Sequence, residues 1–330
     1  MFALTSVNLF FQNLGSWLAG PMKAFSFLGQ QEFAILLLPA IYWCWDSALG
    51  FRLGFVLMLS NGLNNVLKLV FHAPRPYWIN PEVKAISVES SFGLPSGHAQ
   101  NAVALWGRLA AALRRKWMTW LAVFLILMIG LSRLYLGVHF LTDVLAGWLI
   151  GGLLLWLVVL LDEPVTAWLG QKPVGIQILW ATVAAFMLIL LSVVARLALG
   201  AWQVPDLWVT NAGLQTQGQT VEPLKLDGIF TAAGTWWGLT CGYAWFTRRY
   251  GRFDAGGAWE KRGLRFSIGL IVLIVLYAGL SRLLPQSPDG LGFTLRFLRY
   301  AALGGWVSAG APWLFLRIKL ASPYPAKSNV

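Results

Sequence analysis

Charged residues are scarce in this chain. Asp, Glu, Lys and Arg make up 12% of its 330 residues, whereas hydrophobic residues make up 58% and the mean hydropathy is +0.65. A soluble globule of this size needs more polar residues than that to cover its surface. The composition therefore excludes a soluble globular domain and indicates an integral membrane protein.

Cysteines and carboxylates are also few. Cys44 and Cys241 both lie within apolar stretches, which argues against a disulfide framework or a cysteine metal cluster and favours a packing role for both. The 13 Asp and Glu residues form no cluster of the kind that binds magnesium or zinc. We therefore expect neither a metal nor a cofactor.

The beginning of the chain lacks positive charge. Its first twenty residues contain no Lys or Arg, which a signal peptide requires at its start. Asn8, Gln12 and Asn13 are interspersed with aromatic and aliphatic residues. We expect residues 1–30 to form an amphipathic segment that lies in the membrane interface.

Long apolar stretches fill much of the remaining sequence, and most are long enough to cross about 30 Å of hydrocarbon as helices. They lie at about residues 33–48, 51–71, 98–113, 117–136, 139–161, 174–199, 228–247, 264–284 and 297–318. A membrane β-barrel would instead show alternating polar and apolar residues. The expected fold is all-α, a polytopic transmembrane helical bundle.

Two parts follow the interfacial segment. Residues 31–163 contain all the polar clusters described below, and residues 164–330 add further spans whose role the sequence does not reveal. Between these later spans, the polar stretch 200–227 contains Pro205 and Pro223, which discourage regular structure. We expect an extramembrane connector there, with a lid or substrate rim as the alternative.

Positive charge is concentrated on one predicted side of the membrane. The net charge is +12, and more than half of the 25 Lys and Arg residues fall at turns on that side. They are Arg52, Arg114, Arg115, Lys116, Lys172, Arg248, Arg249, Arg252, Lys261, Arg262, Arg265, Arg317, Lys319 and Lys327. This distribution indicates a cytoplasmic face rather than nucleic-acid binding. We expect a protein of a bacterial inner membrane, with the polar clusters facing the periplasm.

One polar cluster contains a histidine and an aspartate four residues apart. His139 and Asp143 share a face if they lie on one helix. The carboxylate can then hold one imidazole nitrogen and stabilise the charge that the ring gains on attack, as in serine-type triads. His139 is the predicted nucleophile. Arg133, placed before the turn Tyr135-Leu136-Gly137, can bind phosphoryl oxygens.

A second cluster, Pro95-Ser96-Gly97-His98, has the pattern of a helix start. Ser96 is a plausible N-cap, and the free amides that follow it can bind an anion. Gly97 allows a close backbone approach, and His98 is placed to protonate a leaving oxygen. Glu82 and Glu89 in the preceding loop are expected to be solvated.

The remaining cluster supplies positive charge. Lys68 lies at the end of an apolar stretch, and Arg75 follows seven residues later between two prolines. Together with Arg133 they can neutralise the three non-bridging oxygens of a five-coordinate phosphorus. His72 lies between these cations without a partner in the pattern, and we interpret it as structural or as a peripheral modulator.

In order and spacing, the clusters Lys-x6-Arg-Pro, Pro-Ser-Gly-His and Ser-Arg-x5-His-x3-Asp resemble the type 2 phosphatidic acid phosphatase (PAP2) superfamily. The resemblance covers about residues 60–150. It implies a PAP2-like catalytic core within residues 31–163 and a metal-independent phosphatase. In this scheme His139 forms a phosphohistidine, His98 is the acid, and phosphate is bound by Lys68, Arg75, Ser96, Gly97 and Arg133.

The leading functional hypothesis is hydrolysis of a lipid phosphate or diphosphate. Candidate substrates are undecaprenyl diphosphate, phosphatidylglycerol phosphate and phosphatidic acid. A phosphotransferase would use the same residues, whereas a phospholipid transporter or binding protein would not need a nucleophile. A vanadium-dependent peroxidase gains nothing from so many spans. The sequence leaves the oligomeric state open.

Overall fold

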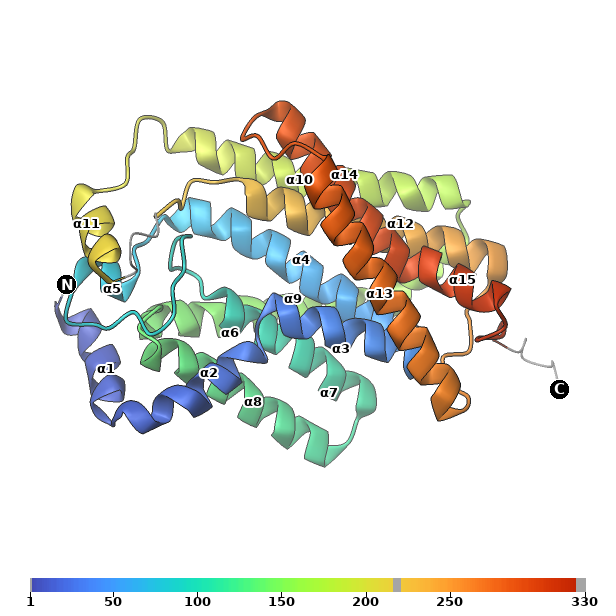
Figure 1. Ribbon diagram of the computed structural model, residues 1–330, viewed down its shortest axis with the longest axis horizontal. Coiled ribbons are helices and arrows are strands. Elements are labelled where there is room, and N and C mark those ends of the chain that lie inside the picture. Colours follow the sequence, from blue (N-terminus) through green and yellow to red (C-terminus); the bar gives the residue numbers. More distant parts are fainter. Residues whose placement is uncertain (1, 216–220, 325–330) are drawn as a thin grey trace. The chain divides into compact units, whose positions relative to one another are not determined.

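The computed structural model describes residues 2–215 and 221–324, which are mostly helical (Figure 1). In these two ranges the only β pairing is an isolated bridge between Phe253 and Pro323. The expected all-α fold is confirmed. Lys327 of the basic face and residues 216–220 of the polar stretch lie outside the described residues.

Five helical segments are long and apolar enough to cross a membrane, and a bent pair can provide a sixth span. The five are Ser47–Ile79, Lys116–Tyr135, Leu141–Gly170, Val174–Ala198 and Trp259–Leu283; the pair is Ser16–Phe27 with Gln31–Cys44, bent by 46°. The expected spans at 98–113, 228–247 and 297–318 are helical but are not among these candidates, and the first and the last each contain a π-helical turn. The chain is a polytopic integral membrane protein.

The described chain divides into two compact units, and the first comprises Met1–Ala34, Ser60–Leu160 and Leu190–Leu226. The helices with all or part of their residues in it are α1 (Phe2–Asn13), η1 (Ser16–Leu18), α2 (Ala19–Phe27), α3 (Gln31–Cys44), α4 (Ser47–Phe71), α5 (Pro76–Ile79), α6 (Gly97–Ala102), η2 (Val103–Gly107), α7 (Arg108–Leu113), α8 (Lys116–Tyr135), α9 (Leu141–Gly170), α10 (Val174–Ala198) and α11 (Asp206–Gln215). All three polar clusters belong to this unit. The domain boundaries expected after residues 30 and 163 stay predictions.

Small residues let α9 approach the start of α6. A Cβ on Gly147 would lie 2.6 Å from the carbonyl oxygen of Ser96, and one on Gly151 would lie 2.7 Å from that of Gln100. This four-residue spacing of glycines is typical of close helix packing in membranes. The contact brings the first turn of α9 beside the N-terminus of α6.

The turn between α8 and α9 follows directly from its sequence. The amide of Gly137 donates to the carbonyl of Leu134 (3.1 Å) and the amide of Val138 to that of Arg133 (3.2 Å), which together form a Schellman motif. Gly137 has φ +77°, a conformation that favours glycine. The motif ends α8 two residues after Arg133 and starts the short segment that contains His139.

We expected the polar stretch after α10 to be a plain connector, but it contains a helix. Residues 206–215 form α11, which packs on α5 (Figure 1). Asn211 Nδ2 donates to the Trp78 carbonyl (3.0 Å), and Gln215 bonds both the Pro81 carbonyl (2.6 Å) and the Ala85 amide (2.9 Å). Pro205 precedes the first helical residue, a position at which proline does not interrupt a helix.

The second unit comprises Ile35–Leu59, Leu161–Ile189 and Asp227–Val330. Besides parts of α4, α9 and α10, it contains most of α3 (Gln31–Cys44) and all of α12 (Asp227–Tyr250), α13 (Trp259–Leu283), α14 (Gly290–Gly305), η3 (Trp306–Gly310) and α15 (Ala311–Arg317). Gly234 and Gly238 of α12 lie against the backbone of α14. Cys44 and Cys241 are half-buried free thiols.

Candidate active site

His139 and Asp143 form a buried pair at the start of α9. His139 lies in the turn before this helix and Asp143 in its first turn, and each is 2% exposed. The imidazole Nδ1 lies 3.3 Å from Asp143 Oδ2, which also accepts a hydrogen bond from the Phe140 amide (2.9 Å). Because the carboxylate faces Nδ1, the hydrogen-bond network assigns the hydrogen to Nδ1 and the lone pair to Nε2.

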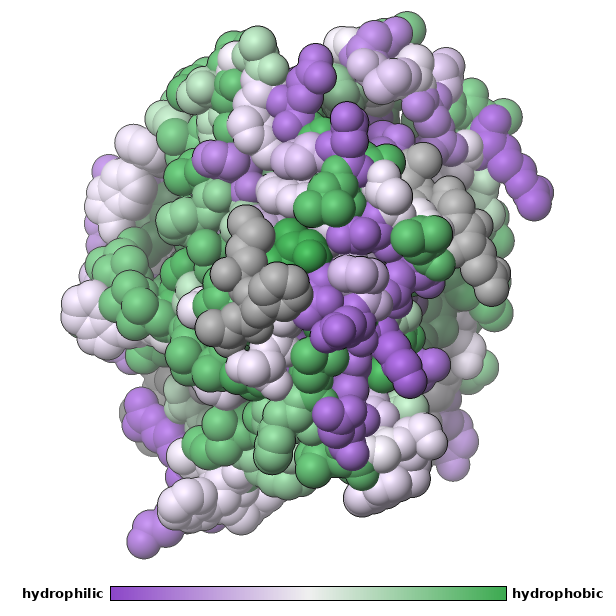
Figure 2. Space-filling view, turned by 90° about the vertical axis from the view of Figure 1, so that its left-hand side faces the viewer, coloured by the Kyte–Doolittle hydropathy of each residue, from purple (hydrophilic) through white to green (hydrophobic). Residues whose placement is uncertain are grey.

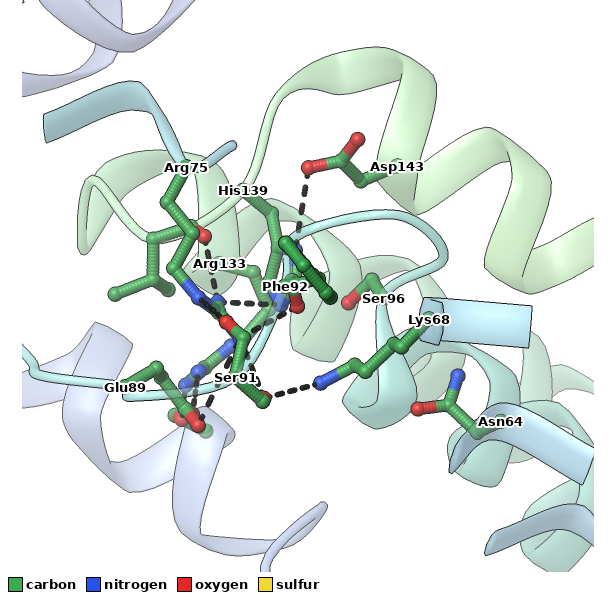
Figure 3. Close-up of polar contacts among 12 residues, drawn as sticks. Asn64, Lys68, Arg75, Glu89, Ser91, Phe92, Ser96, Arg133, His139 and Asp143 are labelled. Carbon is green, nitrogen blue, oxygen red and sulfur yellow. Dashed lines mark hydrogen bonds and ion pairs between the residues drawn. The ribbon is translucent and has the colours of Figure 1, made fainter. Parts of the chain in front are cut away.

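Arg75 brings positive charge to the free nitrogen of this imidazole (Figure 3). Its Nη1 lies 3.3 Å from His139 Nε2 and donates to the Val138 carbonyl (2.8 Å). Nε and Nη2 donate to the carbonyls of Ser91 (2.6 Å) and Phe92 (3.0 Å). The guanidinium group is fully buried, and backbone carbonyls of two segments, the loop before α6 and the turn before α9, hold it in place.

Ser91 connects Arg75 with the cation at the end of α4. Its hydroxyl accepts hydrogen bonds from Lys68 Nζ (2.8 Å) and from Arg75 Nη2 (3.2 Å). Figure 3 shows Lys68 pointing toward this hydroxyl. The predicted cations Lys68 and Arg75 thus converge on one small polar group.

Arg133, at the end of α8, is held from two directions. Its Nη1 donates to the Ser26 hydroxyl (2.5 Å) and its Nη2 pairs with Glu89 Oε1 (2.5 Å). The other carboxylate oxygen of Glu89 lies 4.0 Å from Arg75 Nη2. Our expectation that Glu89 is solvated is wrong, because its carboxylate lies between two buried guanidinium groups.

Two groups of the site that lie outside the membrane-spanning segments have shifted pKa values. Partial burial raises the pKa of Glu89, but Arg75, Arg133, His98 and Lys68 together outweigh it and lower that pKa to about 2. Burial and the same neighbouring basic groups lower the pKa of His139 well below its ordinary value. An anion is therefore favoured at this position, and the imidazole beside it is neutral at neutral pH.

The N-terminus of α6 lies beside Asp143. Ser96 is the N-cap, and its hydroxyl accepts from the Ala99 amide (3.5 Å) while its own amide donates to the Asp143 carbonyl (2.9 Å). Gly97 lies close to Asn64, whose Oδ1 would be 3.0 Å from a Cβ at that position. His98 is in the first turn, and its buried Nε2 has no hydrogen-bond partner in the described part of the chain.

All eight residues predicted for the site belong to the first unit. Lys68, Arg75 and Arg133 meet at Ser91 and Glu89, and Arg75 links them to His139. The sequence interpretation missed Ser26, Glu89 and Ser91, none of which has a periodic or motif-like signal. His72 makes ring contacts with Phe92 and Trp202, with centroids 6.4 and 5.6 Å apart.

Comparison with known protein families gives two matches. The PAP2 superfamily matches residues 49–167, and a PAP2 superfamily phosphatase transmembrane extension matches residues 230–323. Phosphatidylglycerophosphatase B of Bacillus subtilis (strain 168) is 33% identical over 164 residues, which cover 45% of this chain and 77% of that protein. The chain belongs to the PAP2 superfamily.

Two further PAP2 proteins are similar to this chain. Human sphingosine-1-phosphate phosphatase 2 is 34% identical over 136 residues, which cover 39% of this chain and 34% of the human protein. A crystal structure of a transmembrane PAP2 type phosphatidylglycerolphosphate phosphatase from Bacillus subtilis is 30% identical and covers 49% of this chain and 85% of that chain, with a TM-score of 0.42. These relatives are named as phosphatases of lipid phosphates, and the C-terminal spans belong to the family's transmembrane extension.

Proposed function

We propose that this PAP2 protein hydrolyses a lipid phosphate or diphosphate through a phosphohistidine at His139. The observation that carries the proposal is the position of one anion, the Glu89 carboxylate, between Arg133 and Arg75, with Arg75 also 3.3 Å from the free imidazole nitrogen. A phosphoryl group bound by the same cations would lie next to a neutral nucleophile.

In the first step, the lone pair on His139 Nε2 attacks phosphorus, and the bond from phosphorus to the leaving oxygen breaks. His98 gives its proton to that oxygen, and Asp143 stabilises the charged phosphohistidine through Nδ1. In the second step, water attacks phosphorus while His98 takes its proton. The phosphorus–nitrogen bond breaks, which releases inorganic phosphate and restores both imidazoles.

Phosphate binding is assigned to Lys68, Arg75, Arg133, Ser96 and Gly97. The three cations match the charge of the phosphoryl oxygens, and the amides at the start of α6 add donors. In the described residues, no three His, Cys, Asp or Glu side chains are close enough together to hold a metal ion. Metal-independent hydrolysis is part of the proposal because the three cations can neutralise the phosphoryl oxygens without a metal ion.

The substrate class follows from the membrane setting. A lipid keeps its tail in the bilayer while its headgroup reaches a site at the ends of the spans. The end of the first unit that carries α1, α5 and α11 presents a band of hydrophilic side chains between hydrophobic ones (Figure 2). We propose that this end faces the periplasm of a bacterial inner membrane. Phosphatidylglycerol phosphate, phosphatidic acid and undecaprenyl diphosphate remain the candidates.

The test is phosphate release by purified protein from these three lipids in the presence of EDTA. We expect release with at least one of them, and a loss of at least about 10³-fold in the His139→Ala variant. Acid-labile labelled phosphate should be trapped on the wild-type protein alone. Activity that needs added magnesium, or that survives in His139→Ala, would contradict the proposal.

A further inference from the structure

The N-terminal helix α1 turns polar side chains into the protein. Thr5 and Asn8 are buried, whereas Phe10 is 62% exposed. The helix packs on α8 and α5 within the first unit. It lies outside residues 49–167, the part of the chain that the PAP2 family model matches.

Two amides on one face of α1 bind the end of α8. Carbonyl groups in the last turn of a helix lack partners within that helix. Gln12 Nε2 donates to the Tyr135 carbonyl (3.0 Å), and Asn8 Nδ2 donates to the Leu134 carbonyl (2.9 Å). The Leu134 oxygen also accepts a hydrogen bond from the Gly137 amide, so Asn8 binds the second lone pair of that oxygen. These two bonds join α1 to the end of α8.

Asn8 makes one more contact, which lies beyond the end of α8. The same Nδ2 donates to the backbone carbonyl of His139, also at 2.9 Å. A primary amide carries two hydrogens, so both bonds can form at once. Asn8 therefore bridges the turn from Leu134 to His139 and fixes the two ends of that turn relative to each other.

This bridge joins groups on both sides of the phosphate position. Arg133, which pairs with Glu89, directly precedes Leu134, and His139 carries the nitrogen that faces Arg75. A nucleophile must be held close to its in-line geometry, and a shift of about 1 Å can cost about 10²-fold in rate. Other hydrogen bonds in this short turn hold the neighbouring residues Val138 and Phe140, whereas Asn8 binds the backbone of His139 itself.

We propose that Asn8 is a positioning residue for the reaction, one that holds the His139 backbone at a set distance from the end of α8. The inference rests on the proposed function, since it assumes that His139 attacks phosphorus. It gives Asn8, which lies in the segment 1–30 that the sequence predicted only to lie in the interface, a role in the reaction.

The experiment compares Asn8→Asp and Asn8→Leu with Thr5→Val and the wild type in the full chain. Asn8→Asp keeps the size and one oxygen of the side chain but loses the amide hydrogens, and Asn8→Leu removes all polar atoms. Thr5 is the matched control, since it lies on the same buried face and accepts a hydrogen bond from Asn80 (3.0 Å). The readouts are kcat, KM, the rate of phosphohistidine formation and the unfolding temperature.

We expect both Asn8 variants to lower kcat and the rate of phosphohistidine formation by about tenfold to hundredfold, with KM changed by less than about threefold. Thr5→Val should keep the wild-type kcat even where its unfolding temperature falls. If Asn8→Leu does not fold, the nearly isosteric Asn8→Asp decides the question.

Three results would overturn the inference. Wild-type kcat in the Asn8 variants would show that the bridge does not position His139. Equal losses of kcat in Thr5→Val and the Asn8 variants would show that only docking of α1 matters. A wild-type protein that releases no phosphate from any lipid of the panel would remove the proposed function, and the inference with it.

Discussion

The imidazole of His139 is buried among cations, and yet in the proposed reaction it must attack an electrophile. Burial first, and then the neighbouring basic groups, lower its pKa well below the ordinary 6.5. The form that can attack is the deprotonated one, so the nucleophile stays competent as the pH falls through 6.5 and is lost only below the lowered pKa. The cations proposed to bind phosphate therefore also keep the proposed nucleophile unprotonated before substrate arrives.

NMR titration of isotopically labelled histidines tests this directly, because the chain has only three of them. The ring signals of His139, assigned with the His139→Gln variant, should not shift between about pH 8 and pH 6, since a lowered pKa keeps the ring neutral across that interval. A midpoint at or above 6.5 would contradict the structure. The titration is read on the free protein, so ionisation of the substrate phosphate does not disturb it.

Glu89 stabilises the fold through its charge. Its pKa is lowered to about 2, so its ion pairs with Arg133 and Arg75 contribute stability above the ordinary value of 4.5 and are lost as the pH falls from there toward 2. We expect Glu89→Gln to reduce the free energy of unfolding by about 2 kcal/mol at pH 7. This is less than the loss for a fully buried pair, about 3–5 kcal/mol, because the side chain is 29% exposed.

Denaturant unfolding in detergent at pH 7 and at about pH 3 measures the effect of Glu89→Gln. The difference from wild type should shrink at the lower pH, where the carboxylate begins to protonate. Glu82→Gln is the control, since Glu82 is an exposed carboxylate of the same loop. An equal effect of both substitutions, or no effect of either, would show that Glu89 is not an essential counter-ion of the site.

At the scale of secondary-structure elements, the turn between α8 and α9 places His139 by backbone geometry. Gly137 has φ +77°, and a Cβ there would overlap the Lys84 carbonyl oxygen of the neighbouring loop. The Ile86 amide of the same loop donates a hydrogen bond to the Leu136 carbonyl (3.2 Å). The turn is thus fixed against the loop that carries Glu89 and Ser91.

Gly137→Ala should therefore disturb both the turn and the loop. We expect the free energy of unfolding to fall by about 1–3 kcal/mol and kcat to fall with it, because a left-handed backbone conformation strains a residue with a Cβ. Gly152→Ala on α9 is the matched control, since outside its own stretch of helix no atom lies within 4 Å of the added Cβ. Unfolding midpoints and kcat of both variants are compared, and equal stability would refute the role of Gly137.

Sequence patterns predicted those parts of the site that depend on residues close together in the chain. A serine before an apolar run indicated the N-cap Ser96, a glycine after Arg133 indicated the turn, and four-residue spacing indicated the pair His139 and Asp143. Ser26, Ser91 and Glu89 were not predicted, because their contacts depend on tertiary packing of distant segments. Helix α11 was missed because Pro205 was taken to interrupt a helix that it in fact precedes.

At the scale of the whole molecule, apolar stretches predicted five or six of the candidate membrane spans among nine expected, and they did not predict what the spans do. A span needs only length and hydrophobicity, whereas chemistry needs particular side chains. Residues 230–323 therefore showed no motif, although they match the transmembrane extension of PAP2 phosphatases. The predicted orientation rests on a different property, the distribution of Lys and Arg over the turns.

Helix α8 tests this orientation within one unit. Its 20 residues span about 30 Å, roughly the thickness of the hydrocarbon core. Arg115 precedes the helix, in a basic turn with Arg114 and Lys116, and Arg133 lies at its other end beside the loop that contains the exposed Lys84. If the basic turns are cytoplasmic, Arg115 and Lys84 must lie on opposite sides of the membrane.

Single cysteines at these two positions, in a Cys44→Ala, Cys241→Ala background, decide the matter in intact cells. A membrane-impermeant maleimide should label Lys84→Cys directly and Arg115→Cys only after permeabilisation, because positive turns stay cytoplasmic during insertion. Phosphate release by both variants verifies that they are folded. The reverse labelling pattern would place the active site in the cytoplasm, where its lipid substrates would come from the inner leaflet.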